Sequence, residues 1–235
     1  MLRHLLLDLD GTLVDSSPGI YHSFCLACDN LSLEPPSFSQ FRLLIGPPIQ
    51  HIATRLYPHL DKVSLERFRR LFREDYDRVS YRMAEWYPDV VENLIALSEG
   101  LGIDLTIVTN KPTPPAVELI KAADSFHIFS RIVGIDYRVM HGTGLTFASK
   151  AEALSYVLAS CSSDLSNSAY LGDTISDRDA CAACSLLFIG AVYGFHQWLP
   201  EQKPQWCLER FSDIQLLLHS MSQQSQGEPP QSSLS

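Results

Sequence analysis

The chain has few positive charges and no long apolar segment. Its 235 residues include 18 lysines and arginines against 27 aspartates and glutamates, so its formal net charge is −9. Proteins that bind nucleic acids generally carry a basic face, so we expect no nucleic-acid partner. No apolar run approaches the roughly 20 residues of a membrane-spanning helix, and the first residues lack the apolar region of a secretory signal. These absences predict a cytoplasmic protein with no membrane partner.

Cysteine is not scarce, but its arrangement indicates no disulfide framework. Four of the six cysteines form two Cys-x-x-Cys pairs, Cys25/Cys28 and Cys181/Cys184. Such spacing occurs in zinc sites, but both pairs lie in segments with helical periodicity and without glycine-rich turns. Cysteines three residues apart on a helix are more often small core side chains. The sequence favours buried thiols and leaves metal binding by these pairs open.

Apolar runs alternate with helical periods through most of the chain. The composition, 46% hydrophobic and 19% charged, is typical of a globular protein with a substantial core. Strands are predicted at residues 5–9, 103–108, 131–135, 168–171 and 186–189. Helices are predicted at 88–98, 114–123 and 149–158, and from 176. This alternation predicts an α/β fold with a Rossmann-like, doubly wound parallel sheet.

Residues 15–85 interrupt this alternation. They contain helical periods at 17–30, 37–45, 48–57 and 64–80 and no convincing strand. We therefore expect an inserted all-helical cap at 15–85 and a core formed by residues 1–14 and 86–221. Residues 222–235 are rich in serine, glutamine and proline, which predicts a disordered tail.

Polar side chains stand where several predicted strands end. In an open parallel sheet these ends share one edge, where ligands bind. Two carboxylates two positions apart, such as Asp8 and Asp10, repel unless a proton or a cation lies between them. The complete set is Asp8, Asp10, Thr109, Asn110, Asp173 and Asp177, with Lys150 at the start of a helix. Carboxylates, a hydroxyl and an ammonium group at one edge suit phosphoryl transfer with Mg²⁺.

Four ordered motifs resemble those of the haloacid dehalogenase-like hydrolase superfamily. They are DLDGTLVDS from Asp8, TNKP from Thr109, SKAE from Ser149 and GDTISD from Gly172. With a helical cap after the first motif, the chain is most similar to phosphoglycolate phosphatase-like phosphatases. Many relatives have Lys-Pro in the third motif, whereas Ala151 follows the lysine here, so the motif indicates no precise substrate.

The resemblance implies an aspartyl-phosphate mechanism. Asp8 would be the nucleophile, and Asp10 would be the general acid and base. Thr109 and Lys150 would bind the transferring phosphoryl group, with Asn110 beside them.

The resemblance also implies a Mg²⁺ site and a contact from the cap. Asp8 and Asp173 would bind the metal, Asp10 would add its backbone carbonyl, and Asp177 would support the metal shell. Gln50 lies in a stretch, GPPIQ, that resembles the family's cap loop, so it is a candidate substrate contact.

We therefore expect a Mg²⁺-dependent phosphatase, monomeric or homodimeric, that acts on a small phosphorylated metabolite, with phosphoglycolate favoured. A nucleotide or sugar-phosphate phosphatase and a β-phosphoglucomutase-like phosphomutase are alternatives within the fold. A non-catalytic binding protein on the same scaffold is the alternative from a different class. Each motif also has a structural interpretation, because Asp-x-Asp commonly forms a turn and a helix lysine is usually exposed.

Overall fold

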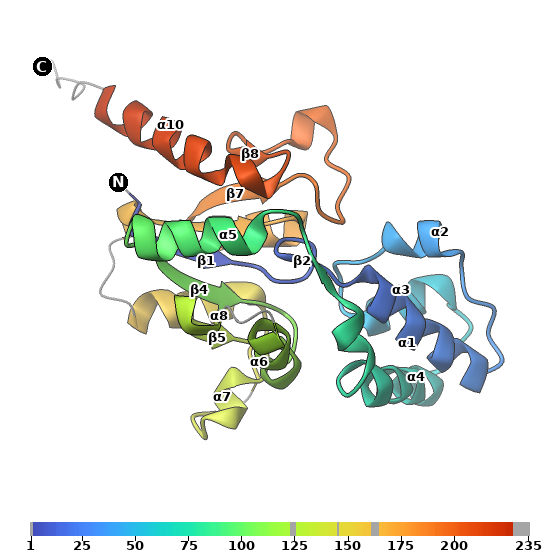
Figure 1. Ribbon diagram of the computed structural model, residues 1–235. Helices are drawn as coiled ribbons and strands as arrows, with labels where there is room; N and C mark the ends of the chain where they lie inside the picture. The colour runs from blue at the N-terminus through green and yellow to red at the C-terminus, as the bar shows by residue number, and fades with distance from the viewer. Residues whose placement is uncertain (1, 123–125, 145, 161–164, 228–235) are drawn as a thin grey trace, which may run out of the picture.

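A six-stranded parallel sheet forms the centre of the computed structural model, which describes residues 2–122, 126–144, 146–160 and 165–227 (Figure 1). Its strands are β1 (His4–Leu7), β4 (Asp104–Val108), β5 (Phe129–Val133), β6 (Ser168–Gly172), β7 (Leu187–Ala191) and β8 (Cys207–Leu208). The spatial order is β5-β4-β1-β6-β7-β8, with every neighbouring pair parallel. The chain starts in the middle of the sheet and extends it first on one side and then on the other. The predicted doubly wound α/β fold is confirmed.

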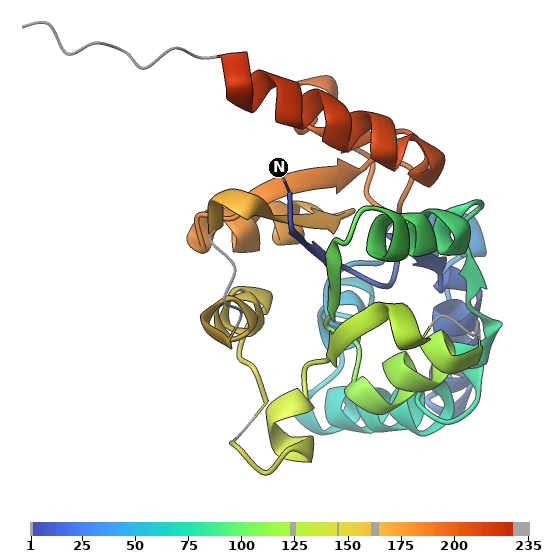
Figure 2. The same ribbon diagram turned by 60° about the vertical axis from the view of Figure 1, so that its left-hand side comes forward.

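Helices cover both faces of this sheet. They are α5 (Val90–Ile95), which continues as a π-helical turn (Ala96–Gly100), α6 (Thr113–Ala122), α8 (Lys150–Ser160), α9 (Ile175–Ala183) and α10 (Ile214–Gly227), whereas the short α7 (Tyr137–Met140) has no buried residue. Leu5 and Leu7 of β1 pack in one buried cluster with residues of α5, α6 and α10, whereas Leu6 packs in a second with α8 and α9. The two clusters follow from the alternation of side chains along a strand. In Figure 2 the gold helix α8 and the green helices lie on opposite sides of the strands.

Two details differ from the sequence prediction. The strand predicted at 131–135 begins two residues earlier, because Phe129 continues the pairing with β4. The tail predicted to be disordered from residue 222 is helical through Gly227, because the apolar residues Ile214, Leu218 and Met221 dock α10 on the core. Residues 228–235 lie outside the described part of the chain. None of the described helices is long and apolar enough to span a membrane.

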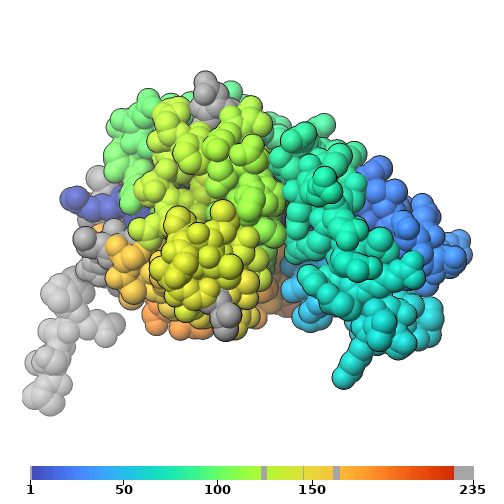
Figure 3. Space-filling model, turned by 90° about the horizontal axis from the view of Figure 1, so that it is seen from below, coloured from blue at the N-terminus to red at the C-terminus, as the bar shows by residue number. Residues whose placement is uncertain are grey.

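A helical insert (residues 16–84) separates β1 from β4, as predicted. Its helices are α1 (Ser17–Asn30), α2 (Phe38–Arg42), α3 (Ile49–Leu56) and α4 (Lys62–Tyr76), followed by a 3₁₀ turn (Ser80–Met83). Asp61 caps α4 by accepting a hydrogen bond from the Ser64 amide at 2.7 Å. Phe24 lies at the centre of an aromatic core, with ring centroids 4.5 Å from Phe41 and 5.1 Å from Phe68. The insert therefore has its own core, and it lies beside the rest of the molecule in Figure 3.

A two-stranded antiparallel ribbon joins the insert to the core. It consists of β2 (Val14–Asp15) and β3 (Glu85–Trp86), with Val14 opposite Trp86. The sequence showed no convincing strand here, because two residues are too few to produce a periodic pattern. The precise domain limits at 14/15 and 85/86 stay a prediction. Further 3₁₀ turns occur at Phe126–Ile128, Leu165–Asn167, Pro200–Gln202 and Phe211–Asp213.

Candidate active site

Strand register brings the sequence motifs to one edge of the sheet. Leu7 of β1 stands opposite Ile107 of β4 and Leu171 of β6. Asp8 follows directly, and its backbone N–H donates to the Leu171 carbonyl at 2.9 Å. Because the neighbouring strands end at the same level, the residues just beyond β4 and β6 flank Asp8, as the sequence predicted.

Lys150 holds Asp8 in a buried position. Its Nζ donates to Asp8 Oδ2 at 2.7 Å and also donates to Asp177 Oδ1. Lys150 begins α8, and its side chain is only 5% exposed. Burial alone would lower the pKa of this lysine, but Asp177 and Asp8 raise it above its ordinary value. The residue is a buried cation between two carboxylates, which excludes the alternative of an exposed helix lysine.

The carboxylate of Asp177 is engaged on both oxygens. Besides the bond from Lys150, its Oδ2 accepts from the Thr174 amide at 3.0 Å and the Thr174 hydroxyl at 2.7 Å. Thr174 in turn caps α9 by accepting from the Asp177 amide. Asp177 is thereby fixed in the first turn of the helix, next to the end of β6.

Asp173 lies at the end of β6 and retains an unpartnered oxygen. Its Oδ2 accepts from the Phe195 amide at 2.8 Å, whereas Oδ1 is buried without a hydrogen bond. Burial, reinforced by the charges of Asp177 and Asp8, raises its pKa well above the ordinary value. A buried acceptor left without a partner is costly, so Asp173 needs a ligand or a proton.

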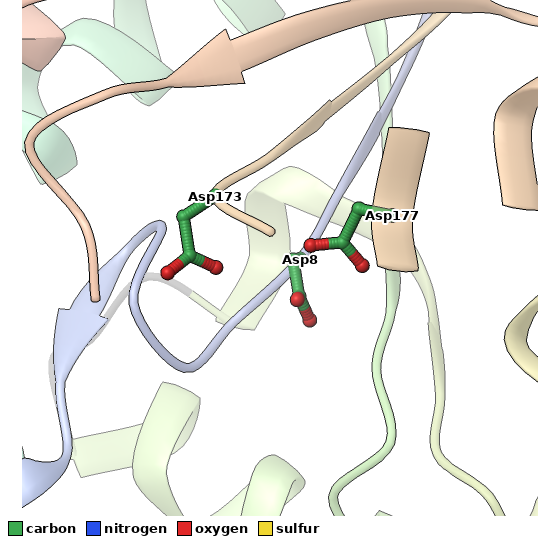
Figure 4. Close-up of side chains that lie close together, drawn as sticks. All are labelled: Asp8, Asp173 and Asp177. Atoms are coloured by element: carbon green, nitrogen blue, oxygen red, sulfur yellow. The ribbon is translucent and has the colours of Figure 1, made fainter. Parts of the chain in front are cut away.

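The three buried aspartates form a group that fits a divalent cation. Each of Asp8, Asp173 and Asp177 offers one oxygen, and these oxygens lie within 4.8 Å of one another (Figure 4). Burial raises the pKa of Asp8 to about 7, opposed by Lys150. A cation at this point would neutralise the mutual repulsion and satisfy the unpaired oxygen of Asp173. Oxygen donors of this kind suit a hard cation such as Mg²⁺.

Gly11 allows the loop after β1 to pass beside this group. Its φ is +82°, and a Cβ added there would lie 2.3 Å from Asp173 Oδ2. Only glycine meets both conditions without strain. The glycine of the first motif therefore allows the loop that carries Asp10 to lie close to Asp173.

Asp10 is outside the three-carboxylate group, because its side chain is paired elsewhere. Lys111 Nζ donates to Asp10 Oδ1 at 2.9 Å and to Oδ2 at 3.2 Å. The same Nζ donates to the Tyr76 hydroxyl at 2.6 Å. The predicted metal contact through the Asp10 backbone carbonyl stays a prediction.

Lys111 and Tyr76 are site residues that we did not predict from the sequence. Burial lowers the pKa of Lys111, but Asp10 and Tyr76 raise it more; burial raises the pKa of Tyr76 to about 12. Because Lys111 lies inside the TNKP motif, it could have been predicted as a site residue from the sequence. Nothing in the local sequence distinguishes Tyr76 from the other core aromatics of its helix.

A cavity of about 330 Å³ lies between the core and the insert. The core lines it with Asp8, Asp10, Thr109, Asn110, Lys111, Lys150 and Asp173, among others. The insert contributes mainly apolar side chains, with Arg73 and Tyr76 of α4 beside them. Gln50 is exposed on α3 and is not among the lining residues, so this arrangement does not bring it to the site.

The cysteine pairs show no sign of a second metal site. Cys25 and Cys28 lie on α1 of the insert, and Cys181 belongs to α9 of the core. All five described cysteines are free, and burial raises the pKa of Cys28 to about 11. Among the described residues, the aspartate group is the only cluster with metal-ligand spacing. Cys161 lies outside the described residues.

Comparison with known proteins agrees with this geometry. Residues 5–191 match the family model described as haloacid dehalogenase-like hydrolase. The chain is 28% identical to a probable phosphatase, IndB, of Dickeya dadantii, over 92% of this chain and 94% of that protein. It is 26% identical to phosphoglycolate phosphatase of Escherichia coli K12, over 97% and 98% of the two chains.

Solved structures share the whole architecture. A predicted phosphatase from Clostridium acetobutylicum superposes with a TM-score of 0.80 at 21% identity, covering 94% of this chain and 99% of its own. A predicted phosphoglycolate phosphatase from Haemophilus somnus superposes with a TM-score of 0.78 at 25% identity, covering 92% and 98%. The sheet and the helical insert are therefore features that these structures have in common with this chain.

Proposed function

The chain belongs to the haloacid dehalogenase-like hydrolase family and is one of its phosphatases, and we propose that Asp8 is the nucleophile that attacks a small phosphomonoester. The observation that carries this proposal is the position of Asp8. Its carboxylate lies buried at the sheet edge, 2.7 Å from the Lys150 ammonium, and lines the cavity with Thr109. A non-catalytic binding protein would not need this complete set of groups.

The first step transfers the phosphoryl group to the enzyme. An oxygen of Asp8 attacks phosphorus, the bond from phosphorus to the ester oxygen breaks, and an aspartyl-phosphate forms. Asp10 gives a proton to the departing oxygen. Lys150 and Thr109 bind the oxygens of the phosphoryl group, on which the negative charge is spread.

The second step releases phosphate. A water molecule attacks phosphorus, the bond from phosphorus to Asp8 breaks, and Asp10 takes the proton of the water. Inorganic phosphate leaves, and both aspartates return to their starting forms. Because Asp10 is 24% exposed while Asp8 is 8% exposed, the acid and base is the more accessible of the two carboxylates.

Mg²⁺ is the cofactor that this site would take. Asp8 and Asp173 would hold it. Asp177 would support them from beside the ion, where its own hydrogen bonds keep it in place. When bound, the ion neutralises negative charge on the phosphoryl oxygens and on the carboxylates.

Phosphoglycolate is the substrate that we propose. The support is the name of several relatives at about 26% identity and the charge of Arg73. Among the described lining residues, Arg73 is the only charged side chain from the insert, and it pairs with Asp77 at 3.0 Å. This pair is about one-third exposed, and a substrate carboxylate can take the place of Asp77 beside Arg73.

The test of the nucleophile is phosphate release from p-nitrophenyl phosphate with Mg²⁺ present. We expect Asp8→Asn to abolish release, because an amide does not attack phosphorus. Asp104→Asn is the matched control, since Asp104 is an exposed aspartate at the opposite end of β4, and we expect wild-type rates. Equal rates for Asp8→Asn and the wild type would disprove the proposed nucleophile.

The test of the substrate compares phosphoglycolate with 2-hydroxyethyl phosphate, which lacks the carboxylate. We expect Arg73→Gln to lower kcat/KM for phosphoglycolate roughly 10- to 100-fold, the size of a lost hydrogen bond to a charged group. The value for hydroxyethyl phosphate should change little. A wild-type enzyme that prefers nucleotides or sugar phosphates in the same assay, or isomerises a sugar phosphate, would replace phosphoglycolate as the proposed substrate.

A further inference from the structure

A buried lysine connects the insert to the proposed acid and base. The side chain of Lys111 is 1% exposed and its Nζ lies between Asp10 and Tyr76. The distances are 2.9 Å to Asp10 Oδ1 and 2.6 Å to the Tyr76 hydroxyl. The ion pair and the hydrogen bond hold the three side chains in one arrangement.

The three residues come from both parts of the molecule. Asp10 and Lys111 belong to loops of the core, after β1 and β4, whereas Tyr76 is the last residue of α4 in the insert. The Tyr76 ring is itself fixed by stacking on Phe72, with centroids 5.3 Å apart. The hydrogen bond from Lys111 to Tyr76 therefore forms only when α4 lies against the core.

The contacts restrict the orientation of Asp10. Without Tyr76, the long side chain of Lys111 would have an unsatisfied donor in a buried place, which favours another rotamer or entry of water. A carboxylate that transfers protons must be held within hydrogen-bond reach of the reacting oxygen. Loss of a fixed lysine would allow the carboxylate to rotate away from that position.

We propose that Tyr76 is a positioning residue that, through Lys111, orients the Asp10 carboxylate for proton transfer when the insert is closed on the core. The inference rests on the proposed function, in which Asp10 is the acid and base. Tyr76 and Lys111 form no covalent bond and exchange no proton in either step. Packing of α4 against the core thereby orients Asp10 and also forms the cavity.

Substrates with different leaving groups distinguish this role from a general packing effect. Nitrophenolate leaves phosphorus without needing a proton, whereas an alkoxide needs one. For Tyr76→Phe we expect kcat/KM to fall about tenfold with 2-hydroxyethyl phosphate and to change less than twofold with p-nitrophenyl phosphate. With p-nitrophenyl phosphate kcat should still fall, and a burst of nitrophenol should appear, because Asp10 also takes a proton from water in the second step.

Tyr57→Phe is the matched control. Tyr57 is another buried tyrosine of the insert, and its hydroxyl donates to the Glu34 carbonyl at 2.8 Å, away from the cavity lining. We expect this variant to lose thermal stability without any dependence of its activity on the leaving group. Tyr76→Phe keeps the ring that stacks on Phe72, so circular dichroism and the melting temperature establish that it folds.

A double-mutant cycle tests whether Tyr76 acts through Lys111. We expect Lys111→Met to show the same leaving-group dependence, and the double variant Lys111→Met/Tyr76→Phe to be no slower than Lys111→Met alone. Additive losses, or an equal loss of kcat/KM with both substrates, would overturn the proposed role of Tyr76. If Asp8→Asn retained activity, the proposed function itself would fail, and the two failures are therefore distinguishable.

Discussion

Four aspartates share one edge of the sheet, and their surroundings give each a different character. Asp8 is buried beside a lysine, Asp173 has an unpaired buried oxygen, and Asp177 accepts from Lys150 and from the Thr174 cap of its helix. Asp10 is partly exposed and paired with Lys111. These differences in burial and in hydrogen-bond partners support the different roles that we propose for the four aspartates, as nucleophile, metal-binding groups and proton carrier.

The raised pKa of Asp8 predicts how the stability of the metal-free protein depends on pH. Its folded value of about 7 lies above the ordinary 3.8, so the native protein retains a proton that the unfolded chain has released. The free energy of unfolding should therefore fall as pH rises between about 4 and 7. Melting temperatures measured in EDTA from pH 5.5 to 7.5 check this.

Asp8→Asn is the control for the pH prediction. The asparagine cannot ionise, so the decrease of melting temperature over this range should be smaller in the variant. Asp173 contributes in the same direction, because its pKa is also raised, and a residual slope is expected. Parallel curves for the variant and the wild type would contradict the assignment to Asp8.

At the scale of elements, close packing of α1 against the 3₁₀ turn Ser80–Met83 depends on Gly19. A Cβ on Gly19 would lie 2.0 Å from the Ser80 carbonyl oxygen. Alanine improves the intrinsic helix propensity by about 1 kcal/mol, but overpacking against backbone costs about 1–3 kcal/mol. We expect the second effect to exceed the first, because the oxygen belongs to the backbone and cannot rotate away.

Gly19→Ala should therefore lower the free energy of unfolding, measured with urea, by up to about 2 kcal/mol, which is the overpacking cost less the gain in helix propensity. Gly100→Ala serves for comparison, since a Cβ there would meet no atom within 4 Å, and it should leave stability unchanged or slightly higher. A Gly19→Ala protein as stable as the wild type would show that α1 can shift without cost.

At the scale of the whole molecule, the proposed metal site joins segments far apart in the sequence. Asp8 follows the first strand of the sheet, whereas Asp173 and Asp177 follow β6. A ligand that binds only the folded chain stabilises it by mass action, by about 2.7 kcal/mol at a concentration a hundredfold above its Kd. We expect Mg²⁺ to raise the melting temperature of the wild type.

Asp173→Asn should abolish most of this increase, because it removes the carboxylate that has a free oxygen. The metal-free variant should melt higher than the metal-free wild type at neutral pH, since an asparagine is neutral in this buried place without taking up a proton. Asp104→Asn should respond to Mg²⁺ as the wild type does. An increase with Mg²⁺ in Asp173→Asn equal to that of the wild type would place the metal elsewhere.

The sequence by itself determined the fold class and most of the site. Strand and helix periods are local, so the parallel sheet and the helical insert could be predicted, and the order of the motifs placed their polar residues at the ends of strands. The polar composition of 222–227 predicted disorder, whereas these residues continue α10, which the buried residues Ile214, Leu218 and Met221 before them anchor on the core.

Only the tertiary structure decided which side chains meet across the two parts of the molecule. Lys111 reaches Asp10 across 101 positions and Tyr76 across 35, whereas Gln50, in a stretch of sequence that resembles the family's cap loop, lies exposed on α3. Periodicity reports which face of a helix is buried, but not which residue of another element it contacts. Such contacts depend on how the insert packs against the core, and the pairing of Lys111 with Tyr76 follows from that packing.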